Sequence, residues 1–175
     1  MVAAVSLVSP WFNLLTALGN LFGLGASSLI SRLLGMKQED RVKYVSVFSI
    51  WGGAVVTLCF SLITWAAQVP ILNFLGASPD TIAYAERYLF WVVVVGGVPT
   101  MVSLSLGHIL RSEGYARPAS VGMMFGGILN VILDPILIFG FNLNVAGAAI
   151  ATAFSNTMSV VFFVVQYLRL RGKSS

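Results

Sequence analysis

The sequence predicts an all-α integral membrane protein that crosses the bilayer five times. Apolar residues make up 58% of the 175-residue chain and charged residues only 9%, and the mean hydropathy is +0.91. A soluble domain would carry about a quarter charged residues. The apolar residues fall into five stretches near or above the roughly 20 residues that cross a bilayer. Short polar segments separate these stretches, so a lipid bilayer is the expected surrounding.

Composition also excludes several functional classes. The net charge of +4 lies mostly in the short loops, so it does not indicate nucleic-acid binding. One cysteine, Cys59, and one histidine leave no partner for an internal disulfide and no residue set for a metal cluster. No nucleophile stands beside a matching base. We therefore expect no enzyme activity, and no cofactor apart from a coupling ion.

The first two spans are expected at about residues 7–33 and 44–68. Residues 1–31 carry no charged side chain, and Arg32 ends this stretch. A charged loop follows, and the second span ends before Pro70. Both stretches are long enough to cross a bilayer.

The third span is expected at about 79–110. Ser-Pro-Asp at 78–80 is a strong helix start, because Ser caps the helix, Pro suits the first position and Asp suits the first turn. Gly96–Gly97 and Pro99 interrupt the apolar run, which predicts a kink or a close helix crossing. Three aromatic residues in its first half suit a belt at the membrane surface: Tyr84, Tyr88 and Trp91.

The fourth and fifth spans are expected at about 118–140 and 145–168. Pro118 stands in the first-turn position that proline favours. The short segment 142–144 joins the two spans, which makes them antiparallel neighbours. Arg169 begins the basic tail.

Lys and Arg are distributed unevenly between the two sides of the predicted bundle. Nine of the ten lie on one side, and only Arg87 lies on the other. Because cytoplasmic loops carry the excess of positive charge, we expect a multi-pass protein of the plasma (inner) membrane with its N-terminus outside and its C-terminus in the cytoplasm. The nine are Arg32, Lys37, Arg41, Lys43, Arg111, Arg117, Arg169, Arg171 and Lys173.

The uncharged beginning of the chain and the odd number of spans predict a longer protein. An external N-terminus without a basic signal region is unusual for an independent chain. We therefore expect a further helix before Met1 and regard the chain as a fragment of a larger transporter.

Asp134 is the sole carboxylate side chain between Gly114 and Leu168. Ionisation in hydrocarbon costs roughly 2.5 to 3.5 kcal/mol even on the mildest scale. On a helix, residues four apart share a face, so Gly122, Gly126, Asn130 and Asp134 form one row. This row indicates an ion or proton site, or alternatively a polar contact that fastens two helices.

Thr152 of the fifth span is expected at the same depth as Asp134. Each lies six residues from the turn between the two spans, which corresponds to about 9 Å. Asn130, Asp134 and Thr152 can therefore supply oxygen ligands to one Na+ or proton. Thr152 also begins a polar stripe with Asn156 and Ser159. The alternative is that the Thr152 hydroxyl bonds its own helix backbone.

Five motifs together resemble the multidrug and toxic compound extrusion (MATE) family in order and spacing. They are VSLVSP at 5–10, GASSLISRLLG at 25–35, LRSEGYAR at 110–117, NVILDP at 130–135 and GAAIAT at 147–152. The resemblance implies a transporter of twelve helices in two lobes, of which residues 1–175 would be a partial N-lobe, from the second helix to the sixth. It implies a cation site at Asn130, Asp134 and Thr152. The family's first-helix aspartate and its C-terminal lobe have no counterpart here.

The resemblance implies secondary transport. The full protein would export small organic, often cationic, drugs or toxins in exchange for Na+ or H+, with Asp134 as the coupling charge and Asn130 and Thr152 as neutral ligands. One alternative is a lipid-linked oligosaccharide flippase of the same superfamily, whose cavity should hold Lys or Arg at mid-membrane. The spans carry none there. A second alternative is a membrane scaffold that transports nothing.

The charge asymmetry yields a testable topology. Single cysteines at Lys37 and Asn142, introduced after removal of Cys59, should react with an impermeant thiol reagent from opposite sides of the membrane, Asn142→Cys from outside. Labelling of both cysteines from outside in intact cells would contradict the predicted orientation.

Overall fold

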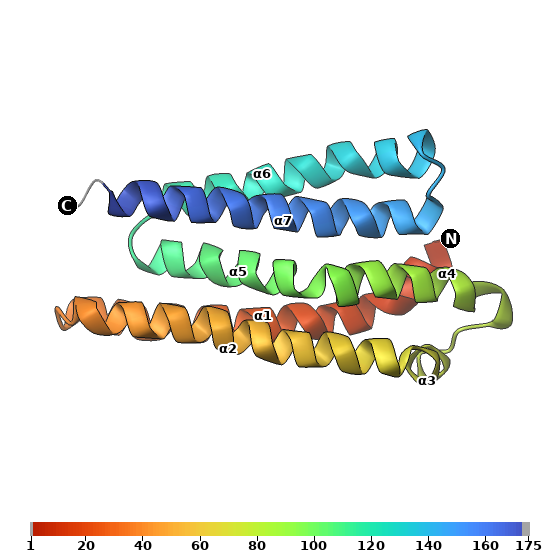
Figure 1. Ribbon diagram of the computed structural model, residues 1–175, viewed down its shortest axis with the longest axis horizontal. Coiled ribbons are helices and arrows are strands. Elements are labelled where there is room, and N and C mark those ends of the chain that lie inside the picture. Colours follow the sequence, from red (N-terminus) through yellow and green to blue (C-terminus); the bar gives the residue numbers. More distant parts are fainter. Residues whose placement is uncertain (1, 173–175) are drawn as a thin grey trace.

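The computed structural model describes residues 2–172 and is helical in all of its regular elements (Figure 1). Met1 and residues 173–175, including Lys173 of the predicted basic tail, lie outside the described range. The elements in order are α1 (Val2–Gly35), α2 (Glu39–Ala66), α3 (Gln68–Phe74), α4 (Pro79–Leu89), the π-helical η1 (Phe90–Val95), α5 (Gly97–Ser112), α6 (Ala116–Pro135), the π-helical η2 (Ile136–Gly140) and α7 (Asn144–Arg171).

The predicted all-α membrane fold is confirmed. Four helices, α1, α2, α6 with η2, and α7, are long and apolar enough to cross a membrane, and the bent pair of α4–η1 and α5 provides a fifth span. Large apolar side chains cover the outside of the bundle, among them Phe48, Trp51 and Phe139, which are 70% or more exposed. Such a surface is stable against lipid and not against water.

The third span bends by 46° where α5 follows η1. The Gly96 N–H bonds to the Trp91 carbonyl, five residues back, so one π-type turn separates the two α-helical segments. Pro99 has no N–H to continue the ladder. Two hydroxyls satisfy carbonyls near the break: Thr100 Oγ1 donates to Gly96 O at 2.6 Å, and Ser61 Oγ donates to Val93 O at 2.9 Å. The kink expected from the glycines and Pro99 is therefore present.

Helix boundaries differ most from the expected ones in three places. α1 begins at Val2, five residues before the expected start. α2 begins at Glu39, five residues before the expected start, because Glu39 and Asp40 stabilise the first turn of a helix. The chain then breaks at Ala67 and forms the short helix α3, which the sequence analysis did not anticipate. Pro70 is accommodated in the first turn of α3, where its missing N–H is not needed.

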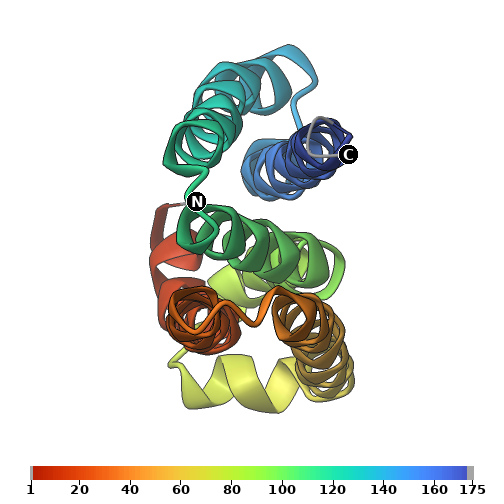
Figure 2. The same cartoon turned by 90° about the vertical axis from the view of Figure 1, so that its left-hand side faces the viewer.

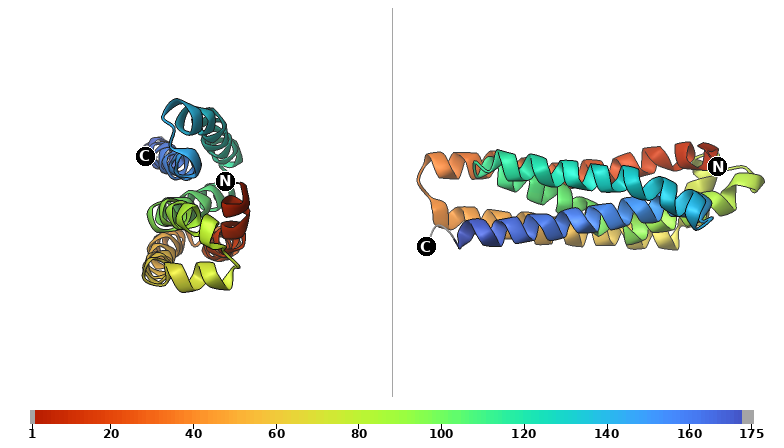
Figure 3. Two further views of the ribbon diagram at one scale, coloured as in Figure 1. Left: turned by 90° about the vertical axis from the view of Figure 1, so that its right-hand side faces the viewer. Right: turned by 90° about the horizontal axis from the view of Figure 1, so that it is seen from above.

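α5 is the central helix of the bundle. It packs against α1, α2, α6 and α7, with α1 and α2 on one side and α6 and α7 on the other (Figure 2). The α1–α2 and α5–α6 turns lie at the same end as the C-terminal end of α7, and the α6–α7 turn lies at the other end (Figure 3). The basic loops therefore share one end of the bundle.

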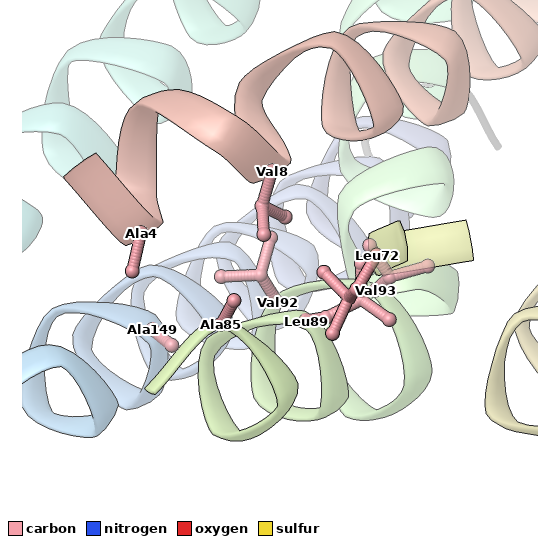
Figure 4. Packing of buried hydrophobic residues seen from close by; sticks show 8 residues of the cluster. All are labelled: Ala4, Val8, Leu72, Ala85, Leu89, Val92, Val93 and Ala149. Atoms are coloured by element: carbon pink, nitrogen blue, oxygen red, sulfur yellow. The ribbon is translucent and has the colours of Figure 1, made fainter. Parts of the chain in front are cut away.

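A cluster of buried apolar side chains packs α1, α3, α4, η1 and α7 together near the end of the bundle that contains the α6–α7 turn. It consists of Ala4, Val8, Leu72, Ala85, Leu89, Val92, Val93 and Ala149 (Figure 4). Tyr88 and Trp91 pack against this cluster, whereas Tyr84 is 47% exposed. Of the predicted aromatic belt, Tyr84 alone has an exposed side chain, because Tyr88 and Trp91 lie on the inward face of α4 and η1.

Close backbone contact joins α6 to α7. A Cβ atom at Gly122 would lie 2.7 Å from Phe163 Cζ and 2.9 Å from Phe162 Cδ1, and one at Gly126 would overlap Ser159 Oγ. Phe163 is fully buried and has little room to move. Small residues allow such an approach, and van der Waals contact then holds the pair in lipid.

Gly122→Ala should destabilise the bundle by roughly 1–3 kcal/mol, because the added methyl overpacks the contact with Phe163. Gly127→Ala is the matched control, since a Cβ there meets nothing within 4 Å. Alanine also has a higher helix propensity than glycine, so this variant should not lose stability. Thermal unfolding of the purified protein in detergent measures both. Equal unfolding temperatures for the two variants would contradict the close contact.

Candidate functional site

The α6–α7 hairpin brings two of the three predicted site residues together. Asn130 Nδ2 donates to Thr152 Oγ1 at 3.3 Å, and both side chains are half-buried. Thr152 Oγ1 in turn donates to Ala148 O at 3.0 Å. The interhelical contact and the bond to its own backbone, stated above as alternatives, therefore occur together.

Asp134 lies one turn beyond Asn130 on the same helix. Its side chain is half-buried, and its Oδ1 atom is shielded from solvent without a hydrogen-bond partner among the described residues. No direct hydrogen bond joins it to Asn130 or Thr152 in this part of the chain. A buried carboxylate oxygen without a donor is costly, so this atom calls for a proton, a cation or a further donor.

Tyr88 lies within electrostatic range of Asp134, which the sequence analysis did not anticipate. Its half-buried phenol lies close enough for the Asp134 carboxylate charge to act on it. Its expected place was the aromatic belt at the membrane surface. The sequence signal for its inward position is its spacing, because Tyr88 follows Ala85 by three residues and therefore shares the face of that buried side chain.

The polar stripe of α7 reaches two other helices. Asn156 Nδ2 donates to Thr100 Oγ1 of α5 at 2.7 Å, and Ser159 Oγ lies 3.5 Å from the Gly122 carbonyl of α6. Thr100 is the residue that satisfies Gly96 O at the bend. One face of α7 thus connects the Asn130–Thr152 pair to the break in the third span.

The chemistry of this donor set is that of a hard cation or a proton. A carboxylate, an amide and a hydroxyl offer oxygen atoms and no soft ligand. Within the described residues, no group of three His, Cys, Asp or Glu side chains could hold a metal ion. Because Asn130 gives its N–H to Thr152, its Oδ1 atom stays available as a ligand or as an acceptor for a protonated carboxyl group.

Comparison with known proteins gives consistent matches. The family model described as MatE matches residues 1–136. The multidrug export protein MepA of Staphylococcus saprophyticus is 42% identical over 169 residues, which cover 97% of this chain and 37% of that protein.

Two solved structures of a multidrug resistance MATE family transporter of the MOP superfamily have the same fold. The outward-facing one aligns with a TM-score of 0.90 at 29% identity and covers 97% of this chain and 37% of its own. The inward-facing one aligns with a TM-score of 0.88 at 30% identity. This alignment covers 93% of this chain and 37% of the transporter. The chain thus spans somewhat more than a third of the length of these relatives.

The Asn130–Thr152 contact can be measured with a double-mutant cycle. Thr152→Val should cost more stability in the parent protein than in the Asn130→Ala background, with a coupling of about 0.6 kcal/mol, typical of hydrogen bonds between membrane helices. Thr157→Val is the control, because the Thr157 hydroxyl donates to Ala153 O of its own helix at 2.8 Å. Reversible unfolding in bicelles supplies the four free energies of each cycle. Zero coupling for Thr152, or equal coupling for Thr157, would contradict the contact.

Proposed function

The chain belongs to the MatE family, and on this premise we propose that it is part of a secondary transporter. The complete protein would export small organic, often cationic, drugs or toxins in exchange for Na+ or H+. The missing first helix and C-terminal lobe would complete it. Its C-terminal end and basic loops would face the cytoplasm, as the charge asymmetry predicts.

The observation that carries the proposal is the buried Oδ1 atom of Asp134. It has no hydrogen-bond partner among the described residues, and it follows Asn130, which is already fixed to Thr152. A proton or Na+ bound here would compensate the carboxylate. Release of that ion would restore the charge, so the site alternates between a neutral and an anionic state.

Asn130 and Thr152 would act as neutral ligands with fixed roles. The Thr152 hydroxyl donates a hydrogen bond to Ala148 O and accepts one from Asn130 Nδ2. The oxygen atoms of both side chains therefore keep lone pairs that a cation can use. Loss of one such ligand should weaken ion binding, whereas loss of the Asp134 charge should remove it.

The two alternative functions, flippase and scaffold, make different predictions about charged residues within the membrane. A flippase for lipid-linked oligosaccharides would need Lys or Arg at mid-membrane, and the sequence has none in the middle of its spans. A scaffold would tolerate neutralisation of Asp134, since a neutral side chain costs less in lipid.

Asp134→Asn in the complete transporter should abolish or uncouple export while leaving insertion and folding intact, because it keeps the shape and removes the charge change. Thr152→Ala should be milder. Asp80→Asn is the matched control, as Asp80 is exposed in the first turn of α4. The measurement is drug efflux per folded transporter under imposed pH and Na+ gradients. Unchanged gradient dependence in Asp134→Asn would overturn the site assignment.

A further inference from the structure

The single histidine of the chain lies between α1 and α5, on the side of α5 opposite the α6–α7 hairpin (Figure 2). His108 of α5 places its Nε2 atom 3.3 Å from Asn20 Oδ1 of α1, and both side chains are half-buried. Asn20 is fifteen residues from Gly35, the last residue of α1, which places it about 23 Å from that end. The imidazole therefore reaches the middle of a membrane-spanning helix.

Gly23 makes room for the ring. A Cβ atom there would lie 2.8 Å from His108 Cδ2 and 3.2 Å from the Ser105 Cα atom. The imidazole thus lies against the backbone of α1, one turn from Asn20, and its orientation is restricted by contact as well as by the hydrogen bond. A ring held in this way has a defined donor nitrogen and a defined acceptor nitrogen.

The face of α1 that carries Asn20 is polar along much of its length. Its polar residues recur at helical spacing: Asn13, Thr16, Asn20, Ser27 and Ser31. Thr16 and Ser31 hydrogen-bond to backbone carbonyls within α1, and Asn13 and Ser31 are exposed. This face therefore carries hydrogen-bonding groups on both sides of Asn20 and is interrupted by Leu24, which is 55% exposed.

Few charges act on the ring. Arg111, three residues on in α5, is the charged group whose field acts on His108, and its guanidinium contacts Met123 Sδ at 3.5 Å. On the helices packed against α5, Asp134 lies about 20 Å further along the bundle. The other described charged side chains on these helices and their connecting turns stand at helix ends: Arg32, Glu39, Asp40, Arg41, Lys43, Glu113, Arg117 and Arg169.

We propose that His108, oriented by Asn20, is a second proton-binding site of this protein, separate from Asp134. In the neutral ring Nε2–H donates to Asn20 Oδ1, and the lone pair of Nδ1 accepts the proton. Protonation turns the contact into a charge-assisted hydrogen bond. It also places a positive charge on a face of α1 that carries no charged residue from Val2 to Ser31.

Nitrogen NMR of the complete protein in nanodiscs tests this directly. With ¹⁵N-labelled histidine, the signals lost in His108→Gln identify this ring. They should show the Nε2–H tautomer at high pH and convert to imidazolium between about pH 5 and pH 8. Asn20→Leu should abolish the tautomer preference and move the midpoint by roughly half a pH unit. Asn13→Leu, on the same polar face, should change neither property.

Each result decides the proposal. A ring that stays neutral throughout this range would overturn it, and so would an Asn20→Leu protein with the parent tautomer and midpoint. Should Asn20→Leu fail to fold, Asn20→Ala in the same experiment carries the comparison. Because the signal comes from the ring itself, it does not depend on efflux or on Asp134.

Discussion

The close approach of α6 and α7 at Gly122 and Gly126 is the contact on which the candidate site depends. Lipid offers no hydrophobic force between helices, so packing at small residues must hold them together. Once the backbones meet at these glycines, the next position of the same row, Asn130, is brought to Thr152. The register of the contact at Gly126 thereby fixes the geometry of a polar pair one turn away.

The same face of α7 ties the site to the bend in the third span. Backbone groups freed by a helix break must find partners inside the protein when lipid surrounds it. Ser61 supplies one at Val93 O. Thr100, whose N–H and hydroxyl both bond to Gly96 O at the start of α5, accepts a hydrogen bond from Asn156, which lies one turn beyond Thr152. A change at the Asn130–Thr152 pair and a change at the bend would therefore act on neighbouring turns of one helix.

The sequence predicted what depends on periodicity and on short connections. The five spans, the bend at Gly96 and the Asn130–Thr152 contact all follow from apolar length, helix spacing or a three-residue turn. It did not predict the inward position of Tyr88, the helix α3 or the contact between Asn20 and His108. The last of these joins residues 88 positions apart. Periodicity shows which face a residue occupies, but not which distant helix covers that face.

The two polar contacts also differ in what can disturb them. Asn130 and Thr152 belong to one hairpin with a short turn, so their geometry is held within that hairpin. Asn20 and His108 belong to helices that no short turn connects and that pack against each other around Gly19, Gly23 and the Ile30–Ile109 cluster. A small tilt of α1 against α5 would separate the imidazole from Asn20 and leave the Asn130–Thr152 pair in place. The histidine contact is therefore the more sensitive of the two to movement of α1.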